Sequence, residues 1–325
     1  MYIVMIIVGL ALLTFGANLL TNGAVGVAKR LRVSEFMIGA TIVAVGTSMP
    51  EFVVSVQSAI QGQADVSIGN VVGSNIFNIY AILGLTSMLV PITFVRSNVR
   101  ADIPICLAVS LLLCVLALDM TLWGGAHNEL SRWDGLLLLV GYGAFLWYMI
   151  RQGRSSGAVE EVNSNDEQEA KQKPLWRSLL LVALGIGGLV LGSDMFLDGS
   201  IELARRVGLS EAVIGIVFVA AGTSLPELFA SLVPALRGKN DIALGNILGS
   251  NIANILLILG TSATITPLRL GGITAADMAV MVSAVVAVLL SAFVIGRNKI
   301  SRFEGLIFFG IYVVYTLWLL GVIVA

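Results

Sequence analysis

Charged side chains are scarce in this chain of 325 residues. They make up 12% of it, whereas 57% of the residues are hydrophobic and the mean hydropathy is +0.95. A soluble domain carries about 25% charged residues. The 19 basic residues nearly balance the 20 acidic ones. These figures exclude a disordered chain, a nucleic-acid binder with a basic face and an ordinary soluble enzyme. They predict a protein that lies in the lipid bilayer.

Histidine and cysteine are scarcer still. The single histidine, His127, lies in a polar stretch, which excludes a histidine metal cluster or a Ser–His pair within the membrane. Cys106 and Cys114 are eight residues apart in one apolar run, about 12 Å along a helix and too far for a disulfide. The chain has no HExxH pattern and no phosphate-binding loop. We therefore expect neither an enzyme nor a resident cofactor.

Long apolar runs are abundant. A spanning helix needs about 20 mostly apolar residues, and short polar links separate most of the runs that meet this length. The pattern predicts an all-α polytopic membrane protein with ten transmembrane helices. Because the first run has no basic segment before it and no cleavage site, we expect a retained span rather than a signal peptide. The predicted spans are 2–28, 36–60, 66–92, 103–123, 133–150, 175–203, 211–236, 243–266, 273–296 and 303–324.

The basic residues are distributed unequally between the links. With ten spans, 15 of the 19 Lys and Arg residues fall on one side, and the remaining four are Arg132, Arg205, Arg206 and Arg269. Basic loops favour the cytoplasm. This predicts that the polar linker 151–174 is flexible and cytoplasmic and that both termini lie outside. By analogy, we expect a prokaryotic inner (plasma) membrane.

The chain contains an internal repeat. Residues 34–92 align with 210–268 without a gap, and 27 of the 59 positions are identical. The copies are five spans apart, an odd number, so they must cross the membrane in opposite directions. Inverted repeats place a substrate site near the midplane, where the copies meet, which favours a carrier with alternating access. We therefore divide the chain into a five-helix repeat (1–150), the linker (151–174) and an inverted repeat (175–325).

Two matching motifs, GTSMPE at 46–51 and GTSLPE at 222–227, lie in the middle of the second and seventh spans. Pro50 and Pro226 have no N–H, so the carbonyls of Gly46 and Gly222 lose their helical donors. Broken helices are tolerated in a membrane where they line a polar cavity. Carbonyl, hydroxyl and carboxylate oxygens suit hard cations such as Ca²⁺ and Na⁺. The alternative is a pair of protonated, hydrogen-bonded glutamates at proline kinks.

A second pair of motifs, GNVVGSNIFN at 69–78 and GNILGSNIAN at 245–254, follows in the third and eighth spans. Their glycines allow helices to approach closely. We expect Ser74, Asn78, Ser250 and Asn254 to face the same cavity. We expect Asn70, Asn75, Asn246 and Asn251 to bond between helices or to cap broken segments.

Four further acidic residues are weaker candidates for the cation site. Asp194 and Asp198 are one turn apart in the sixth span. They either pair with Arg205 or Arg206 or lie along an ion path, and we favour pairing. Asp277 and Glu304 lie near span ends, where an interfacial role is expected.

With both motifs doubled and in order, the chain resembles the calcium/cation antiporter superfamily, specifically its sodium/calcium exchanger branch of prokaryotic type. The resemblance implies ten helices and central cation sites formed by helices 2, 3, 7 and 8. It also implies that helices 1 and 6 slide to alternate access, and that the activity is exchange of Ca²⁺ for Na⁺. The expected ligands are the side chains or carbonyls of Ala44, Thr47, Ser48, Glu51, Ser74, Asn78, Ala220, Thr223, Ser224, Glu227, Ser250 and Asn254.

One departure from the family pattern concerns the counter-ion. Positions 78 and 254 are both Asn, whereas members of this branch often carry an Asp in one copy. The two remaining carboxylates, Glu51 and Glu227, balance one Ca²⁺ or two Na⁺. Antiport of Ca²⁺ or another divalent cation against H⁺ therefore stays open. A cation channel with a glutamate ring is a further alternative, against which the inverted repeats and the broken helices argue.

Overall fold

The computed structural model shows a chain built almost wholly from helices. Within the described residues, eight helical segments are long and apolar enough to span a membrane, and two consecutive shorter helices that form one broken span would be a ninth. The structure describes residues 2–94, 98–118, 128–155, 174–206, 222–295 and 298–321.

The chain divides into two compact units, Met1–Thr47 with Phe145–Gly249, and Ser48–Ala144 with Ser250–Ala325. Each unit contains elements from both sequence repeats. The division of the chain into two repeats joined by the linker 151–174 stays a prediction from the sequence. Two helices, α9 (Arg132–Ser155) and α15 (Asn240–Ala253), have residues in both units. The other elements of the first unit are α1 (Tyr2–Leu31), α2 (Glu35–Ile38), the π-helix η1 (Gly39–Val43), α3 (Ala44–Thr47), α11 (Leu175–Arg206) and α14 (Leu225–Leu236).

The second unit contains the remaining helices and two short antiparallel ribbons. Strand β1 (Ile92–Thr93) pairs with β4 (Lys299–Ile300), and β2 (Glu129–Leu130) pairs with β3 (Leu268–Arg269). Its helices are α4 (Met49–Ile60), α5 (Ala64–Ile76), η2 (Phe77–Leu83), α6 (Gly84–Leu89), η3 (Asn98–Asp102), α7 (Ile103–Ala117), η5 (Asn254–Leu259), α16 (Gly260–Ile265), α17 (Ala275–Leu290), η6 (Ser291–Ile295) and α18 (Arg302–Leu319).

The helices follow the predicted spans. The third span is one continuous helical segment, Ala64–Leu89, and the eighth is its counterpart, Asn240–Ile265. Both are strongly buried, which fits the near-absence of charge in them. Of the predicted spans, residues 119–123, 211–221, 296 and 322–324 lie outside the described residues. The seventh span is therefore seen only as α14 and the short turn before it.

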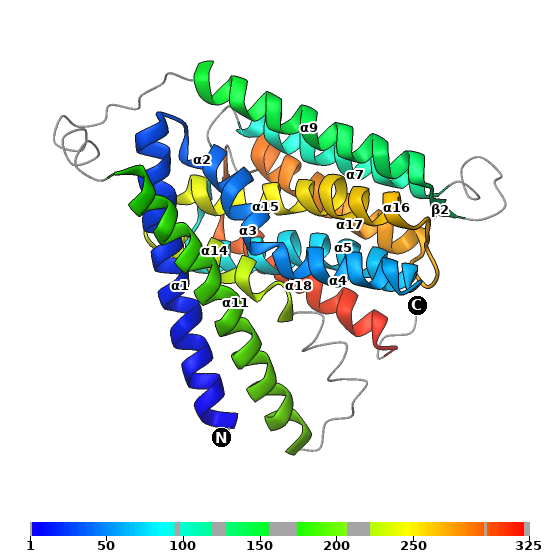
Figure 1. Cartoon of the computed structure of the whole chain (residues 1–325), viewed down its shortest axis with the longest axis horizontal. Coiled ribbons are helices and arrows are strands. Elements are labelled where there is room, and N and C mark those ends of the chain that lie inside the picture. The colour runs from blue at the N-terminus through cyan, green and yellow to red at the C-terminus, as the bar shows by residue number, and fades with distance from the viewer. Residues whose placement is uncertain are drawn as a thin grey trace. The chain divides into compact units, whose positions relative to one another are not determined.

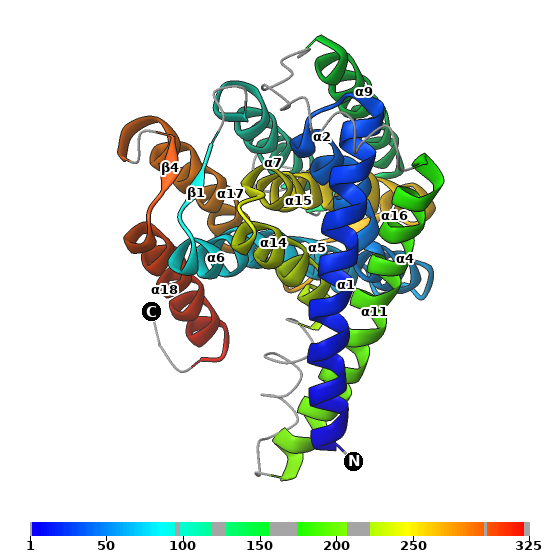
Figure 2. The ribbon, with the colours of Figure 1, turned by 90° about the vertical axis from the view of Figure 1, so that its left-hand side faces the viewer.

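A seam of glycines joins α1 to α11. Both views show these two long helices side by side (Figures 1 and 2). A Cβ added at Gly16 would lie 2.8 Å from the backbone nitrogen of Leu189, and one at Gly192 would lie 2.8 Å from that of Leu13. Only glycine permits this approach of two backbones. The glycines recur every seven residues, at Gly9, Gly16 and Gly23 on α1 and at Gly185, Gly192 and Gly199 on α11.

Acidic residues act as caps at several helix starts, among them those of α17 and α18. In α17 the Thr274 hydroxyl accepts from the backbone of Asp277, and the Asp277 carboxylate accepts from the backbone of Thr274. Ser301 and Glu304 form the same capping box at α18. Such reciprocal bonds satisfy backbone donors that the first turn leaves without partners. The structure therefore places Asp277 and Glu304 at helix starts, as their positions near span ends predicted.

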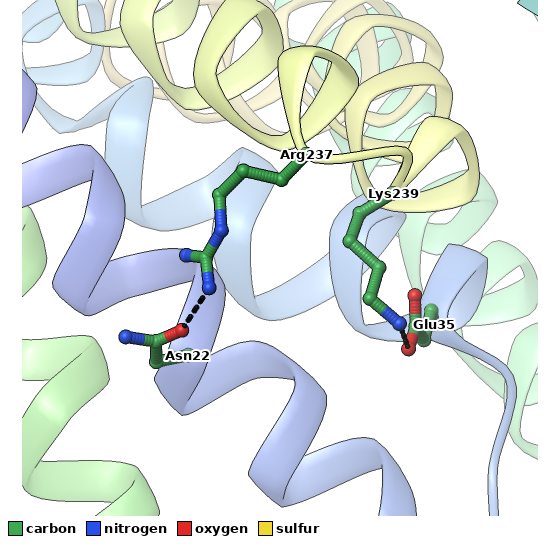
Figure 3. A network of polar contacts seen from close by, with 4 residues as sticks. All are labelled: Asn22, Glu35, Arg237 and Lys239. Carbon is green, nitrogen blue, oxygen red and sulfur yellow. Dashed lines mark hydrogen bonds and ion pairs between the residues drawn. The ribbon is translucent and has the colours of Figure 1, made fainter.

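Two basic residues tie the turn between α14 and α15 to other parts of the first unit (Figure 3). The Arg237 guanidinium donates to Asn22 Oδ1 on α1 at 2.7 Å. Lys239 Nζ lies 2.8 Å from Glu35 Oε1 at the start of α2. Gly238 between them has φ +74°, which a side chain rarely adopts. The turn therefore aims both basic side chains at neighbouring helices.

Candidate cation site

The first GTSxPE motif interrupts its helix, as predicted. Helix α3 ends at Thr47 and α4 begins at Met49, with Pro50 in its first turn. Because Pro50 has no N–H, the helical ladder cannot continue through it. Regular bonding resumes where the amide of Phe52 donates to the carbonyl of Ser48. The break places Glu51 in the first turn of α4, where it is 1% exposed.

Helix α5 holds the Glu51 turn in place. The Asn70 amide donates to the backbone carbonyl of Glu51 at 3.2 Å and to Ser55 Oγ at 2.9 Å. One turn further along α5, Ser74 Oγ lies 3.5 Å from Glu51 Oε1. Asn70 therefore fixes the backbone of α4, and Ser74 brings a hydroxyl to the carboxylate.

The second repeat shows the same construction around Glu227. The Asn246 amide donates to the carbonyl of Glu227 at 3.3 Å and to Ser231 Oγ at 2.9 Å. Glu227 is also 1% exposed. In addition, Asn246 Oδ1 accepts from the Thr47 hydroxyl at 3.1 Å. The bonds that hold each buried glutamate are thus repeated at equivalent positions, 176 residues apart.

Four asparagines form a symmetric network in the second unit. Asn75 donates to the backbone carbonyl of Asn251 at 3.3 Å, and Asn251 donates to that of Asn75 at 3.2 Å. Asn78 donates to Asn251 Oδ1, and Asn254 donates to Asn75 Oδ1, both at 3.0 Å. As predicted, Asn70, Asn75, Asn246 and Asn251 all bond between helices.

The network leaves two amide oxygens without donors. Asn78 Oδ1 and Asn254 Oδ1 are buried and have no hydrogen-bond partner among the described residues, and the same holds for Ser250 Oγ. A buried acceptor without a partner costs about 1–3 kcal/mol. A bound cation would remove that cost. These three atoms belong to residues that the sequence predicted as ligands.

The predicted ligands fall into two sets. The predicted ligands that lie in the second unit, which we call the first half-site, are Ser48, Glu51, Ser74, Asn78, Ser250 and Asn254. The second half-site, in the first unit, consists of Ala44, Thr47, Thr223, Ser224 and Glu227. Ala220 lies outside the described residues.

Both half-sites consist of oxygen atoms. No group of three or more His, Cys, Asp or Glu side chains occurs in the described part of the chain, so each half-site joins one carboxylate to hydroxyl, amide and carbonyl oxygens. This donor set favours Ca²⁺ and Na⁺ over softer transition metals. A carboxylate in a low-dielectric interior also favours a positive partner.

The sequence interpretation missed some serines that form hydrogen bonds at the two motifs. Ser55 and Ser231 are identical in the two repeats, so the repeat itself could have identified them. Ser193 Oγ donates to the carbonyl of Gly222 at 2.8 Å. No repeat signal pointed to it, because its counterpart in the first repeat is Ala17.

Asp194 and Asp198 lie exposed on α11. Arg206 forms an ion pair with Glu202 at 2.9 Å. Its guanidinium also lies 4.7 Å from the ring centre of Tyr2. The expected pairing of the two aspartates was with Arg205 or Arg206, and the contacts that the structure describes for Arg206 are with Glu202 and Tyr2.

Comparison with known proteins gives extensive matches. Residues 1–151 and 177–321 match the family model described as sodium/calcium exchanger protein. The chain is 36% identical over 318 residues to a putative antiporter of Alkalimonas amylolytica, with 96% of each chain covered. It is 31% identical to a sodium/calcium exchanger of Methanosarcina acetivorans, covering 95% of this chain and 96% of the relative.

A solved structure extends the comparison to the fold. The sodium/calcium exchanger from Methanococcus jannaschii superimposes with a TM-score of 0.81 at 31% identity, and 96% of each chain is covered. The ten-helix inverted-repeat arrangement expected from the sequence is consistent with that fold.

Proposed function

The chain belongs to the sodium/calcium exchanger family, and from this premise we propose that it exchanges Ca²⁺ for Na⁺ by secondary active antiport. The relatives and the apolar helices make it an integral, multi-pass membrane protein related to cation antiporters. One observation carries the proposal. Each repeat holds a buried glutamate at a proline break and fixes the backbone of that glutamate with an asparagine.

The proposed mechanism uses the charge of the two glutamates. Together they carry −2 when ionised, which one Ca²⁺ or two Na⁺ neutralise. Both ions prefer carboxylate, hydroxyl and carbonyl oxygens, so they compete for the same ligands and occupy them in turn. If the carrier reorients only when its charge is neutralised, a Ca²⁺ ion moving one way is coupled to Na⁺ moving the other way. The proposal requires no enzyme activity and no resident cofactor.

The test is uptake of ⁴⁵Ca²⁺ into proteoliposomes preloaded with Na⁺, with K⁺, or with only a proton gradient. We expect the Na⁺ gradient to drive uptake. Replacing the Glu51 carboxylate by an amide, in Glu51→Gln, should nearly abolish it, because the ligand set loses half of its negative charge. Glu227→Gln is the matched variant in the second repeat. Near-normal exchange by Glu51→Gln would overturn the assignment of this residue.

Antiport of Ca²⁺ against H⁺ is the second candidate. The amides at Asn78 and Asn254 favour it, because they leave only two carboxylates to bind ions and both could carry protons. Ca²⁺ uptake that the proton gradient alone drives, and that a Na⁺ gradient does not change, would support this candidate over Na⁺ exchange. Flux without any counter-ion would instead indicate a channel.

The cellular placement is part of the proposal. The unequal distribution of basic residues supports a cytoplasmic linker 151–174, although the linker residues 156–173 lie outside the described part of the chain. We propose a prokaryotic plasma membrane with both termini on the outer side.

A further inference from the structure

One of the differences between the two repeats lies beside the broken helices. Most polar contacts around Glu51 recur around Glu227, but Ser193 on α11 corresponds to Ala17 on α1. Ser193 is 5% exposed, and its hydroxyl donates to the carbonyl of Gly222 at 2.8 Å. Ala17 has no hydroxyl and cannot form the equivalent bond.

The Gly222 carbonyl is the acceptor that Pro226 leaves without a helical donor. In a continuous helix it would accept from the amide four residues later, but residue 226 is proline. Thr223 and Ser224 form a turn rather than a helix, and glycine at 222 gives the backbone additional freedom. The Ser193 bond therefore restrains a carbonyl of the second GTSxPE motif that Pro226 cannot partner.

The first repeat holds its broken turn in a different way. There the Thr47 hydroxyl lies 3.1 Å from Asn246 Oδ1 and 3.2 Å from the carbonyl of Ala44. Its counterpart, Thr223 Oγ1, is buried and has no hydrogen-bond partner among the described residues. The first repeat thus uses its own threonine as a restraint, whereas in the second repeat the restraint comes from α11 and the threonine hydroxyl stays available.

We propose that Ser193 is a positioning residue for cation binding, which holds the turn at Gly222 so that the Thr223 hydroxyl is free to ligate the transported ion. This inference rests on the proposed function, since it assumes that the second half-site binds a cation. It makes the two repeats unequal: the Thr47 hydroxyl of the first repeat is engaged, whereas the Thr223 hydroxyl of the second has no hydrogen-bond partner among the described residues.

The expected effect of losing Ser193 is weaker binding. Without the restraint, the turn samples more conformations and must be ordered when the ion binds, which lowers affinity. The Thr223 hydroxyl could also turn to the vacant Gly222 carbonyl and leave the ion. A neutral hydrogen bond contributes about 1 kcal/mol, which corresponds to about a fivefold change in affinity.

The experiment measures ⁴⁵Ca²⁺ uptake by reconstituted wild-type protein, Ser193→Ala and Ser193→Thr. We expect Ser193→Ala to raise the KM for Ca²⁺ about fivefold while kcat changes less than about twofold. Ser193→Thr keeps a hydroxyl and should restore most of the affinity. Ser200→Ala is the matched control, because Ser200 is also buried on α11, two turns further along.

A double-mutant cycle separates positioning from a general loss of stability. If Ser193 acts through the Thr223 hydroxyl, Ser193→Ala should raise KM much less in a Thr223→Val background than in wild type. Three results would each overturn the proposal. They are an unchanged KM for Ca²⁺ in Ser193→Ala, an equal rise of KM in Ser200→Ala, and fully additive effects of Ser193→Ala and Thr223→Val on KM.

A binding measurement distinguishes failure of this inference from failure of the proposed function. The rise in Tm of the detergent-solubilised protein with Ca²⁺ concentration reports binding without transport. If wild type transports no Ca²⁺ under any gradient, the proposed function fails, and the Tm titration still decides the role of Ser193. There, Ser193→Ala should need about five times more Ca²⁺ for the same rise, and an unchanged titration would refute the inference.

Discussion

At the residue scale, hydrogen bonding decides which atoms of the asparagine network can face an ion. Asn75 and Asn251 each donate to the opposing backbone and accept from the amide of Asn254 or Asn78. With these amide groups committed, the oxygens of Asn78 and Asn254 are the atoms left over. An asparagine amide has two donors and one acceptor group, so its partners fix its orientation. Asn75 and Asn251 thus orient the two predicted ligands.

This network gives a prediction at the same scale. Asn251→Ala removes the acceptor for Asn78 and the donor to the Asn75 carbonyl, so stability should fall by about 1–3 kcal/mol. Because Asn78 would then be free to rotate, Ca²⁺ affinity should fall as well. Thermal unfolding in detergent, with and without Ca²⁺, measures both effects.

The control for the asparagine prediction is Asn18→Ala on α1. Asn18 is half-buried, and its amide donates within its own helix to the carbonyl of Thr14 at 2.9 Å and accepts from Arg237 at 3.4 Å. Asn75→Ala should behave like Asn251→Ala, because the two residues have equivalent bonds. Unchanged Ca²⁺ affinity in both network variants would show that the network does not orient the ligands.

At the element scale, α1 and α11 come into backbone contact at their glycines. The seven-residue spacing of glycines keeps them on one face of α1 and one face of α11, and small residues provide the close packing that lipid cannot provide by exclusion. The broken helices are held by polar bonds from neighbouring elements. The continuous helices α1 and α11 are therefore closely packed, whereas the interrupted helices are held by hydrogen bonds from neighbouring elements.

The glycine seam gives a prediction with a control on the same helix. In Gly192→Ala the new Cβ would lie 2.8 Å from the nitrogen of Leu13 and 2.9 Å from the carbonyl oxygen of Gly9. The two backbones must then separate, at a cost of about 1–3 kcal/mol. Gly187, also on α11, has open space around it, so Gly187→Ala should be neutral or stabilising by up to about 1 kcal/mol.

Unfolding temperatures of the two glycine variants in one detergent check this prediction. A lower Tm for Gly192→Ala and an unchanged or higher Tm for Gly187→Ala are expected. Equal Tm values would show that the seam does not require backbone contact.

At the scale of the whole molecule, the distribution of charge determines how the chain sits in the membrane. With few charges overall, the predicted ten spans place 15 of the 19 basic residues on one side, which predicts that this side is cytoplasmic. The odd offset between the repeats then requires that one copy of each motif points inward and the other outward. Orientation and inversion are therefore properties of the complete chain, which no single span shows.

The orientation can be tested by cysteine labelling. In a variant with Cys106 and Cys114 replaced by serine, Ser164→Cys in the linker should react with a membrane-impermeant maleimide only from the cytoplasmic side. Gly272→Cys, in the exposed turn before α17, should react only from the outer side. The reverse pattern would invert the predicted topology, and labelling of both sites from one side would contradict the number of spans.

Much of this protein followed from its sequence, because the relevant signals are local or repeated. Apolar runs identified the spans, since a bilayer demands about 20 apolar residues. The prolines at 50 and 226 located the helix breaks, because proline lacks an N–H wherever it occurs. The repeated polar residues identified asparagines that bond between helices, whereas the ligand set stays a prediction.

The tertiary structure decided how these residues are held. The bond from Ser193 to Gly222 and the bond from Thr47 to Asn246 join segments far apart in the chain. Neither bond follows from spacing, because each depends on which helices pack together. The partner of the glycine seam and the direction of each asparagine amide are decided in the same way. A sequence repeat shows what the two copies share. Only three-dimensional packing shows that the Thr47 hydroxyl is engaged while Thr223 Oγ1 has no hydrogen-bond partner among the described residues.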